Sequence, residues 1–287
     1  MINMVDLHTH SNMSDGRYSP AELIILGKKQ GLSVLALTDH DTIIGINEAG
    51  KAAKQAGIGF IAGIELEINR ELAQGEFHLL GLGIDKPGQA FIEAVADLSR
   101  RREERNLEIL NRMEKLDIKA DYKEILAMSG GYSVGRPHFA SFLVKHRIVK
   151  NMEQAFIRYL GKGKPLYVPK AGLDFDHALR IIKEAGGLAI LAHPMSLYAS
   201  WSRLPSLIKS LKDRGLQGLE AWHPSARVSY CKRLECLAKS LELYVTAGSD
   251  FHGENRRNRK LGITAGGRKI ERSMLDAIPE LAEKVYS

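Results

Sequence analysis

The sequence is poor in cysteine and has no long apolar runs. Only Cys231 and Cys236 occur among 287 residues, so a disulfide framework and a cysteine-rich zinc motif are excluded, and a reducing cytoplasm is the simplest compartment. No run of about 18 apolar residues could span a membrane. The N-terminal residues lack the basic and apolar regions of a secretory signal. We therefore expect a cytoplasmic protein without a membrane-spanning segment.

The remaining composition is that of an ordinary globular protein. Apolar residues make up 44% and charged residues 26% of the chain, and its length allows one large domain or two smaller ones. The formal net charge of +7 favours acidic partners such as phosphates or nucleic acid. A basic surface that only contacts water would produce the same charge, so both interpretations stay open.

Predicted strands and helices alternate along much of the chain. The run 5–11 predicts a first strand, and Ser19 followed by Pro20 and Glu22 is typical of a helix start. The continuous apolar run 34–38 is typical of a parallel strand covered on both faces. Further strands are predicted at 59–64, 76–84, 187–192, 216–220 and 243–248. Further helices are predicted at 45–55, 175–185, 203–214, 226–241 and 270–284. The pattern indicates about seven β/α units.

The alternation breaks in the middle of the chain. A long helix is predicted at 89–119, and shorter helical pieces follow at 123–128, 136–146 and 152–160. A strand signal returns only at 165–169. We interpret residues 97–168 as a helical insertion that caps a site. It would separate a first barrel part, 1–96, from a second part, 169–287.

Histidines and carboxylates gather at the predicted strand ends. His8 and His10 are spaced i, i+2, which directs both to the same side of a strand, and Asp250 and His252 repeat this spacing at the last strand. Other potential ligands at or near strand ends are His40, Glu65, His78 and His193. In a β/α barrel the carboxyl ends of the strands converge on one face. The pattern therefore predicts a site for several metal ions.

Each of these residues also has an ordinary explanation. His78 lies within an apolar strand and could be a core histidine. Asp15 before Gly16 could be a turn residue, and His193 before a proline could begin a loop. The other histidines on helical segments are interpreted as surface or packing residues: His138, His146 and His177.

Six short motifs resemble those of the PHP (polymerase and histidinol phosphatase) family of metal-dependent phosphoesterases. They are Asp-Leu-His-Thr-His at 6–10, Ser-Asp-Gly at 14–16, Leu-Thr-Asp-His-Asp at 37–41, Gly-Ile-Glu at 63–65, Ala-His-Pro at 192–194 and Gly-Ser-Asp-Phe-His at 248–252. The resemblance covers most of the chain outside the insertion. It implies an α/β fold, a distorted seven-stranded (β/α)7 barrel with a helical insertion.

The resemblance also implies a ligand set. One metal would be held by His8, His10, Glu65 and Asp250. Glu65 would bridge to a second metal held by His78 and His193. A third would be held by Asp15, His40 and His252. Members of the family use manganese, iron or zinc, so we expect two or three divalent ions, with manganese as the first candidate.

These ligands predict a mechanism. A bridging carboxylate requires two metals about 3.5–4 Å apart, which can share a hydroxide that attacks phosphorus in line. Glu65 and Asp250 are therefore predicted catalytic residues. His223 is a third, as a phosphate ligand or a proton donor to the leaving group. Asp6 and Asp39 adjoin ligand histidines and either hold them or face away.

Basic residues in two regions are candidates for substrate binding. Arg136 stands at a predicted helix start, where its guanidinium and free backbone N–H groups would suit a phosphate. Related phosphatases carry a similar Arg-Pro-His motif, although a surface arginine is the alternative. Arg17 and Lys170 are further candidates. The basic run 256–260 follows the last ligand motif and could receive a second phosphate or an RNA backbone, or only contact water.

The resemblance and the layout favour a phosphomonoesterase acting on a small nucleotide. The first hypothesis is removal of the 3′-phosphate from 3′,5′-bisphosphonucleotides such as 3′-phosphoadenosine 5′-phosphate. A 5′-to-3′ exoribonuclease acting on short RNA is the second hypothesis, and a histidinol phosphatase is the third. A catalytically silent metal-binding accessory module is the non-enzymatic alternative. The complete ligand set argues against that module.

Overall fold

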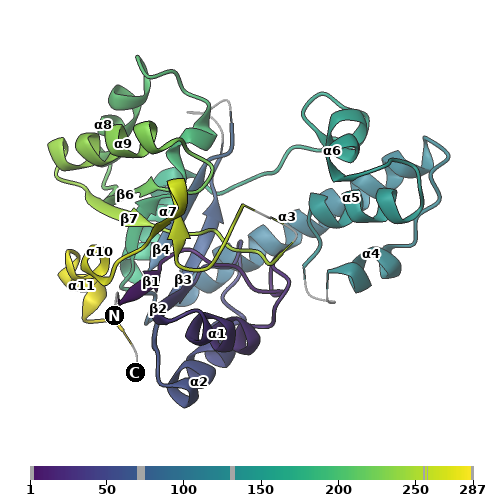
Figure 1. Ribbon diagram of the computed structural model, residues 1–287. Coiled ribbons are helices and arrows are strands. Elements are labelled where there is room, and N and C mark those ends of the chain that lie inside the picture. The colour runs from purple at the N-terminus through teal and green to yellow at the C-terminus, as the bar shows by residue number, and fades with distance from the viewer. Residues whose placement is uncertain (1–2, 70–74, 130–132, 255, 257, 286–287) are drawn as a thin grey trace.

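A seven-stranded sheet in the order β1-β2-β3-β4-β5-β6-β7 forms the centre of the molecule (Figure 1). The computed structural model describes residues 3–69, 75–129, 133–254, 256 and 258–285. The strands are β1 (Met4–Asp6), β2 (Leu32–Leu37), β3 (Gly59–Glu67), β4 (His78–Leu82), β5 (Leu188–Leu191), β6 (Gly218–Trp222) and β7 (Tyr244–Ala247). Strand β4 pairs antiparallel with both β3 and β5, and the other neighbouring strands are parallel.

The sheet closes into a barrel through the segments that follow β1 and β7. The His8 carbonyl accepts a hydrogen bond from the Asp250 N–H at 2.8 Å, and the His10 N–H donates to the Phe251 carbonyl at 3.0 Å. The Asp6 carboxylate accepts the backbone N–H groups of Ser249 at 3.0 Å and Gly262 at 2.8 Å. Asp6 therefore joins the two ends of the barrel. The predicted distorted seven-stranded barrel is confirmed.

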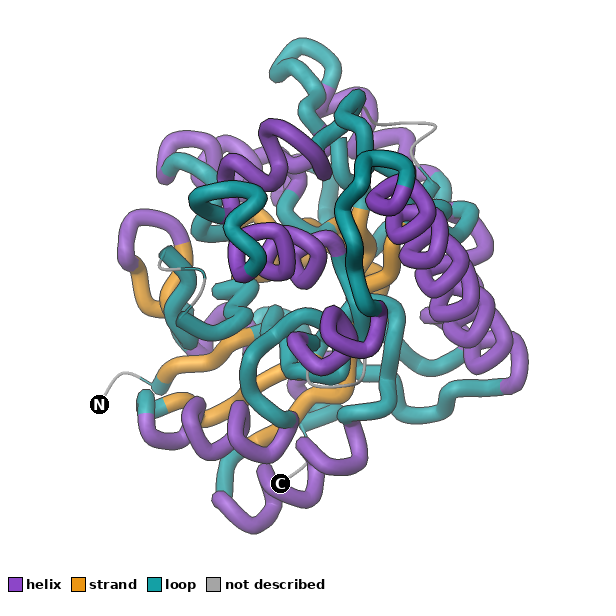
Figure 2. Tube along the Cα trace, turned by 90° about the vertical axis from the view of Figure 1, so that its right-hand side faces the viewer, coloured by secondary structure: helices purple, strands orange, loops and turns teal. Residues whose placement is uncertain are grey.

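Amphipathic helices surround the strands (Figure 2). They are α1 (Pro20–Lys29), α2 (Ile46–Ala56), α7 (Phe175–Glu184), α8 (Leu204–Asp213) and α9 (Val228–Ser240). Ser19 and Glu22 form the capping box expected at the start of α1, and the Asp174 side chain caps α7. Apolar residues on the inner faces of these helices pack on the sheet, where β2 and β5 are completely or largely buried.

The helical insertion has an apolar core of its own. Its elements are α3 (Gln89–Glu114), α4 (Tyr122–Met128), α5 (Arg136–Lys145), α6 (Met152–Ala155) and a π-helical turn, η2 (Phe156–Leu160). Phe91 and Leu98 of α3 pack in the barrel core, whereas Ile109 and Met113 pack with α5. Figure 1 shows α4, α5 and α6 beside the part of α3 that extends away from the sheet. The division at residues 97 and 168 stays a prediction, because α3 contributes to both cores.

Two predicted elements are wrong. Residues 165–169 form no strand; prolines at both ends remove backbone donors, and Leu166 is buried in the insertion core. The predicted helix 270–284 is broken into α10 (Arg272–Asp276) and α11 (Pro279–Ala282), because Pro279 begins a new helix. A small hairpin, β8 (Ile263–Thr264) and β9 (Arg268–Lys269), was not predicted.

None of the helices that the structure describes is long and apolar enough to cross a membrane.

Candidate active site

The side chains expected to hold the first metal meet around one point. Glu65 Oε2 lies 3.3 Å from His8 Nε2 and 3.3 Å from His10 Nε2. Asp250 Oδ1 lies 3.2 Å from His10 Nε2 and 3.6 Å from His8 Nε2. All four residues are buried, with exposed fractions of 0–6%. Two imidazoles and two carboxylates thus converge at the carboxyl ends of the parallel strands, where β/α barrels place their chemistry.

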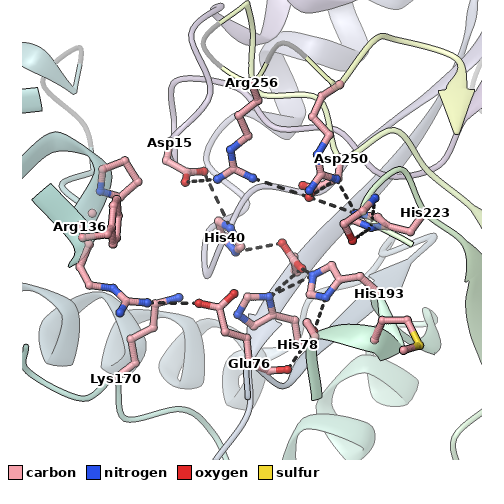
Figure 3. A pocket seen from close by; sticks show the side chains of 18 of the residues that line it. Asp15, His40, Glu76, His78, Arg136, Lys170, His193, His223, Asp250 and Arg256 are labelled. Atoms are coloured by element: carbon pink, nitrogen blue, oxygen red, sulfur yellow. Dashed lines mark hydrogen bonds and ion pairs between the residues drawn. The ribbon is translucent and has the colours of Figure 1, made fainter. Parts of the chain in front are cut away.

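The other oxygen of Glu65 faces a different pair of histidines. Oε1 lies 3.0 Å from His78 Nδ1 and 2.8 Å from His193 Nε2 (Figure 3). His78 is the first residue of β4 and pairs with Glu67. Because β4 runs antiparallel, its amino end lies beside the carboxyl ends of its neighbours. The sequence placed His78 within the predicted strand 76–84. The antiparallel direction of β4 explains how His78 reaches the site.

A third group of side chains lies beside the first. Asp15 Oδ1 lies 3.0 Å from His252 Nε2 and 3.9 Å from His40 Nε2, while His40 Nδ1 lies 3.0 Å from Glu65 Oε2. Asp15 Oδ1, Glu65 Oε2 and His252 Nε2 are buried, and they have no hydrogen-bond partner in the described part of the chain. Buried polar atoms normally have partners. Shared cations would satisfy these atoms, so the donor set fits divalent metals such as manganese, iron or zinc.

The carboxylates of the site and His40 have pKa values that favour the forms that bind cations. Burial tends to raise the pKa of Glu65, but His40 and His78 outweigh it and hold that pKa well below its usual range. The pKa of Asp250 is likewise lowered, because His252 and His8 outweigh its burial. Burial lowers the pKa of His40 to about 4, which keeps its ring neutral. Ionised carboxylates and neutral imidazoles are the ligand forms that metals require.

Burial tends to lower the pKa of His8, but Glu220 and Glu65 outweigh it and raise that pKa well above its usual range. Nearby carboxylates likewise outweigh burial and raise the pKa of His10 to about 9 and the pKa of His78 to about 10. These three rings must therefore release a proton when a cation binds.

Two glutamates that the sequence analysis missed hydrogen-bond to the nitrogen atoms of His8 and His78 that face away from the proposed metals. Glu220 on β6 accepts a hydrogen bond from His8 Nδ1 at 2.9 Å, and it also accepts the His193 backbone N–H at 2.7 Å. Glu67 Oε2 lies 2.8 Å from His78 Nε2. Two signals in the sequence could have revealed them. Glu67 is spaced i, i+2 from Glu65 on β3, and Glu220 is a carboxylate inside the apolar run 216–222. Such partners fix the orientation of the rings.

Replacement of Glu220 by glutamine tests this positioning role. We expect metal affinity and catalytic rate to fall about 10- to 100-fold, because the amide is a weaker acceptor for His8 Nδ1 and its NH₂ group cannot accept the His193 N–H. Metal titration with steady-state kinetics would measure the loss. The control is Glu93→Gln, an exposed glutamate whose partner is Gln89. Equal affinities in both variants would contradict the role of Glu220.

The other predicted carboxylate neighbour, Asp39, shapes the loop that carries Asp15. Its carboxylate accepts hydrogen bonds from the hydroxyls of Ser11 at 2.6 Å and Ser14 at 2.6 Å. Asp39 also accepts the Ser11 backbone N–H at 2.8 Å. Among the described residues, Asp39 therefore hydrogen-bonds to this loop and to no ligand histidine.

A cavity of about 440 Å³ opens over the three groups. Cationic side chains from two regions line it: Arg102, Arg105, Arg136, Lys170, Arg256 and Arg259. Figure 3 shows Arg136 and Lys170 to the left of the histidines and Arg256 above His40. Arg136 Nη2 lies 3.2 Å from Glu76 Oε1, and Lys170 Nζ lies 2.6 Å from Glu67 Oε2. The basic run 256–260 therefore reaches the site through Arg256 and Arg259; Arg257 lies outside the described residues.

His223 also lines this cavity. Its Nε2 lies 3.2 Å from Asp250 Oδ2 and 2.6 Å from Arg259 Nη1. An arginine can only donate, so Nε2 is the acceptor in this contact. Proton donation by His223 would require Arg259 to leave it, and that role stays a prediction.

Four residues lie away from the cavity lining. The side chain of Arg17 is 57% exposed and pairs with Glu254. His138 Nδ1 accepts the Gly135 N–H, and His146 pairs with Glu124. His177 lies in the first turn of α7. Arg17 is therefore not among the side chains that the structure brings together around the cavity.

Comparisons with known proteins agree with this geometry. A model of the PHP domain matches residues 6–165. A 5′-3′ exoribonuclease of Haemophilus influenzae is 39% identical over 88% of this chain and 91% of its own length. A 3′,5′-nucleoside bisphosphate phosphatase of Chromobacterium violaceum is 32% identical over 91% of each chain. A solved amidohydrolase structure from the same species, with bound sulfate and no metal, matches with a TM-score of 0.85 and 31% identity over 98% of this chain and 96% of that chain. The chain therefore belongs to the PHP family of metal-dependent phosphoesterases.

Proposed function

We propose that this protein removes the 3′-phosphate from 3′,5′-bisphosphonucleotides, using two or three divalent ions. The observation that carries the proposal is the division of the Glu65 carboxylate. Oε2 faces His8 and His10 with Asp250, whereas Oε1 faces His78 and His193. One carboxylate shared between two sets of ligands is the arrangement of a two-metal phosphoesterase.

The assignment of ligands follows these contacts. His8, His10, Glu65 and Asp250 would hold one ion. His78 and His193 would hold a second with Glu65, and Asp15, His40 and His252 a third. Bound there, the ions supply positive charge to the phosphoryl oxygens and lower the pKa of a coordinated water. The chain itself fixes the ligands through Glu220 and Glu67, and it contributes His223 and Arg259 at the cavity wall.

The distribution of cations supports a substrate with two phosphates. Arg256 and Arg259 contact the ligand carboxylates of Asp15 and Asp250, close to the reacting phosphate. Arg136 and Lys170 lie to the left of the histidines, apart from Arg256 (Figure 3). A second phosphate on the same nucleotide would meet this second group of cations. One small monoester, such as histidinol phosphate, has no second phosphate that could bind to this group.

A 5′-3′ exoribonuclease is the second candidate function. The relative from Haemophilus influenzae that bears this name shares more identity with the chain than the bisphosphate phosphatase does. The same cations would then bind the phosphates of an RNA end. A silent accessory module is disfavoured, because all nine predicted ligand side chains are present and the ones compared above converge.

A screen of hydrolysis tests the proposal, with inorganic phosphate measured for the phosphomonoesters and released nucleoside 5′-monophosphates measured for RNA. The substrates are 3′-phosphoadenosine 5′-phosphate, adenosine 5′-monophosphate, short 5′-phosphorylated RNA and histidinol phosphate, each with and without added manganese. We expect the highest kcat/KM with the bisphosphate. Highest activity on RNA would favour the second candidate function. No release from any substrate in the presence of manganese, iron or zinc would reject the enzyme.

Replacement of Arg136 by alanine tests its predicted role in substrate binding. We expect kcat/KM for nucleotides to fall about 10-fold or more, mainly through a higher KM, because a charge-assisted contact to phosphate is lost. Steady-state kinetics on the bisphosphate would measure this. Arg158→Ala, a variant in the π-helical turn of the insertion outside the cavity lining, is the control. An unchanged KM would contradict a role of Arg136 in substrate binding.

A further inference from the structure

Arg105 is a buried cation that lines the cavity and forms no ion pair with any residue that the structure describes. It lies on α3 with an exposed fraction of 7%. Its Nη2 donates to Asn106 Oδ1 at 2.9 Å, but its buried Nε has no hydrogen-bond partner in the described ranges of the chain. Among the residues that the structure describes, no carboxylate lies within ion-pair distance of this guanidinium. Buried charges are normally paired, so this exception requires an explanation.

The cations around Arg105 each have a carboxylate of their own. Arg102 forms an ion pair with Asp41. Arg136 pairs with Glu76, and Lys170 pairs with Glu67. Ion pairs between described residues thus account for three of the four cations on this side of the cavity and leave out the most deeply buried guanidinium. One further anion would complete the set.

The charges around Arg105 make its unpaired state unfavourable. Burial lowers its pKa to about 9, and repulsion from Arg102 and Arg136 adds to this effect, although Glu67 and Asp41 oppose it. An anion that entered this part of the cavity would relieve both the burial cost and the repulsion. A guanidinium presents its donors in a rigid fork that matches phosphate oxygens.

The structure also fixes where this guanidinium points. The Asn106 side chain that accepts from Arg105 donates through its Nδ2 to the Val134 carbonyl at 2.9 Å. Val134 precedes Gly135 and Arg136, which begin α5 and line the same cavity. Arg105 is therefore held by the long helix α3 and tied to the segment that carries Arg136. Its orientation is set before any ligand arrives, which reduces the entropy lost on binding.

We infer that Arg105 receives the phosphate that is not hydrolysed and thereby selects bisphosphonucleotides over nucleoside 3′-monophosphates. This inference rests on the proposed function. It assigns the selection to a residue of α3, outside the Gly135-Arg136-Pro137-His138 stretch and the basic run 256–260. Arg105 does not touch the reacting phosphate and has a binding role only.

Kinetics on paired substrates test the inference with the metal-loaded enzyme. Arg105→Gln should lower kcat/KM for 3′-phosphoadenosine 5′-phosphate about 10- to 150-fold, the effect of losing a hydrogen bond to a charged group. For adenosine 3′-monophosphate, which lacks the second phosphate, kcat/KM should change less than about threefold. Arg105→Lys keeps the charge and should recover part of the loss. The matched control is Arg100→Gln on the exposed side of α3, where the arginine pairs with Asp97 and Glu104.

A binding measurement separates this inference from the proposed function. Titration calorimetry with adenosine 5′-monophosphate measures binding of a nucleotide that carries only the second phosphate. Arg105→Gln should raise the Kd for this nucleotide by the same factor by which it lowers kcat/KM for the bisphosphate. If the wild type fails to hydrolyse the bisphosphate, the proposed function fails, while the Kd comparison still tests Arg105. Equal losses of kcat/KM on both substrates, or an unchanged Kd, would overturn the inference. Circular dichroism of each variant verifies folding, and Arg105→Lys replaces Arg105→Gln if the latter does not fold.

Discussion

Glu65→Gln is expected to abolish hydrolysis of phosphate esters. We expect kcat to fall about 10³-fold or more, because the substitution removes a central charge and replaces one carboxylate oxygen by an NH₂ group that cannot bind a cation. Both oxygens of Glu65 are in use, with His8 and His10 near Oε2 and His78 near Oε1. Metal analysis of the purified variant should show fewer ions per chain than the wild type. Kinetics and metal content together measure the role of the bridge.

A graded comparison sharpens this experiment. Glu67→Gln changes the same atoms two residues further along β3, where the side chain contacts the outer nitrogen of His78 and Lys170. We expect a loss of about 10- to 100-fold for that variant. Glu93→Gln on the surface of α3 should behave as the wild type. Near-normal turnover of Glu65→Gln with a full complement of metal would reject the bridging role.

Removal of metal ions should eliminate activity and destabilise the fold. The buried carboxylates of Glu65 and Asp250 and the half-buried carboxylate of Asp15 lie close to histidines, and cations shared between them lower the free energy of the folded state only. At about 1,000 times the dissociation constant this contributes about 4 kcal/mol, which corresponds to a fall in Tm of roughly 5–10 °C on chelation. Calorimetry with and without chelator, followed by phosphate-release assays, would measure both effects.

Adding back single metals identifies the ion that the site uses. Manganese, iron and zinc are each added to the chelated protein, and the recovery of Tm and of kcat is compared. Metal analysis of the protein as purified should find two or three ions per chain. Glu93→Gln should respond to chelator as the wild type does. A protein that contains no metal, binds none and keeps its Tm in chelator would contradict the ligand assignment.

Local sequence chemistry predicted much of the barrel. Ser19 with Glu22 and Asp174 marked helix starts through short-range hydrogen bonds, and the structure has these caps. The apolar runs of β2 and β5 were recognised because strands buried on both faces have no polar alternation. The predicted helix 270–284 failed at Pro279, and residues 165–169 failed as a strand. In both places the prediction followed the apolar pattern, although the prolines were local signals against a continuous helix or strand.

Residues that depend on long-range pairing were harder to predict. His78 lay within an apparent strand, and only the antiparallel pairing of β4 with β3 brings it beside Glu65. Glu220 resembled an isolated carboxylate in an apolar run until the fold placed His8 Nδ1 2.9 Å away. A side chain that holds another residue from behind has no fixed spacing from it in sequence, because the two lie on different strands.

The sequence by itself determined the PHP family, the seven-unit β/α barrel and the set of histidines and carboxylates at the strand ends. His8 and His10 carry this information because i, i+2 spacing acts within one segment. The family resemblance implied how the ligands group, but only the tertiary structure brings them together, since closure of the segment after β1 against the segment after β7 places Asp250 beside His10. It also decided that Arg105 is buried without an ion pair to any described residue, because burial and pairing arise from contacts between distant segments.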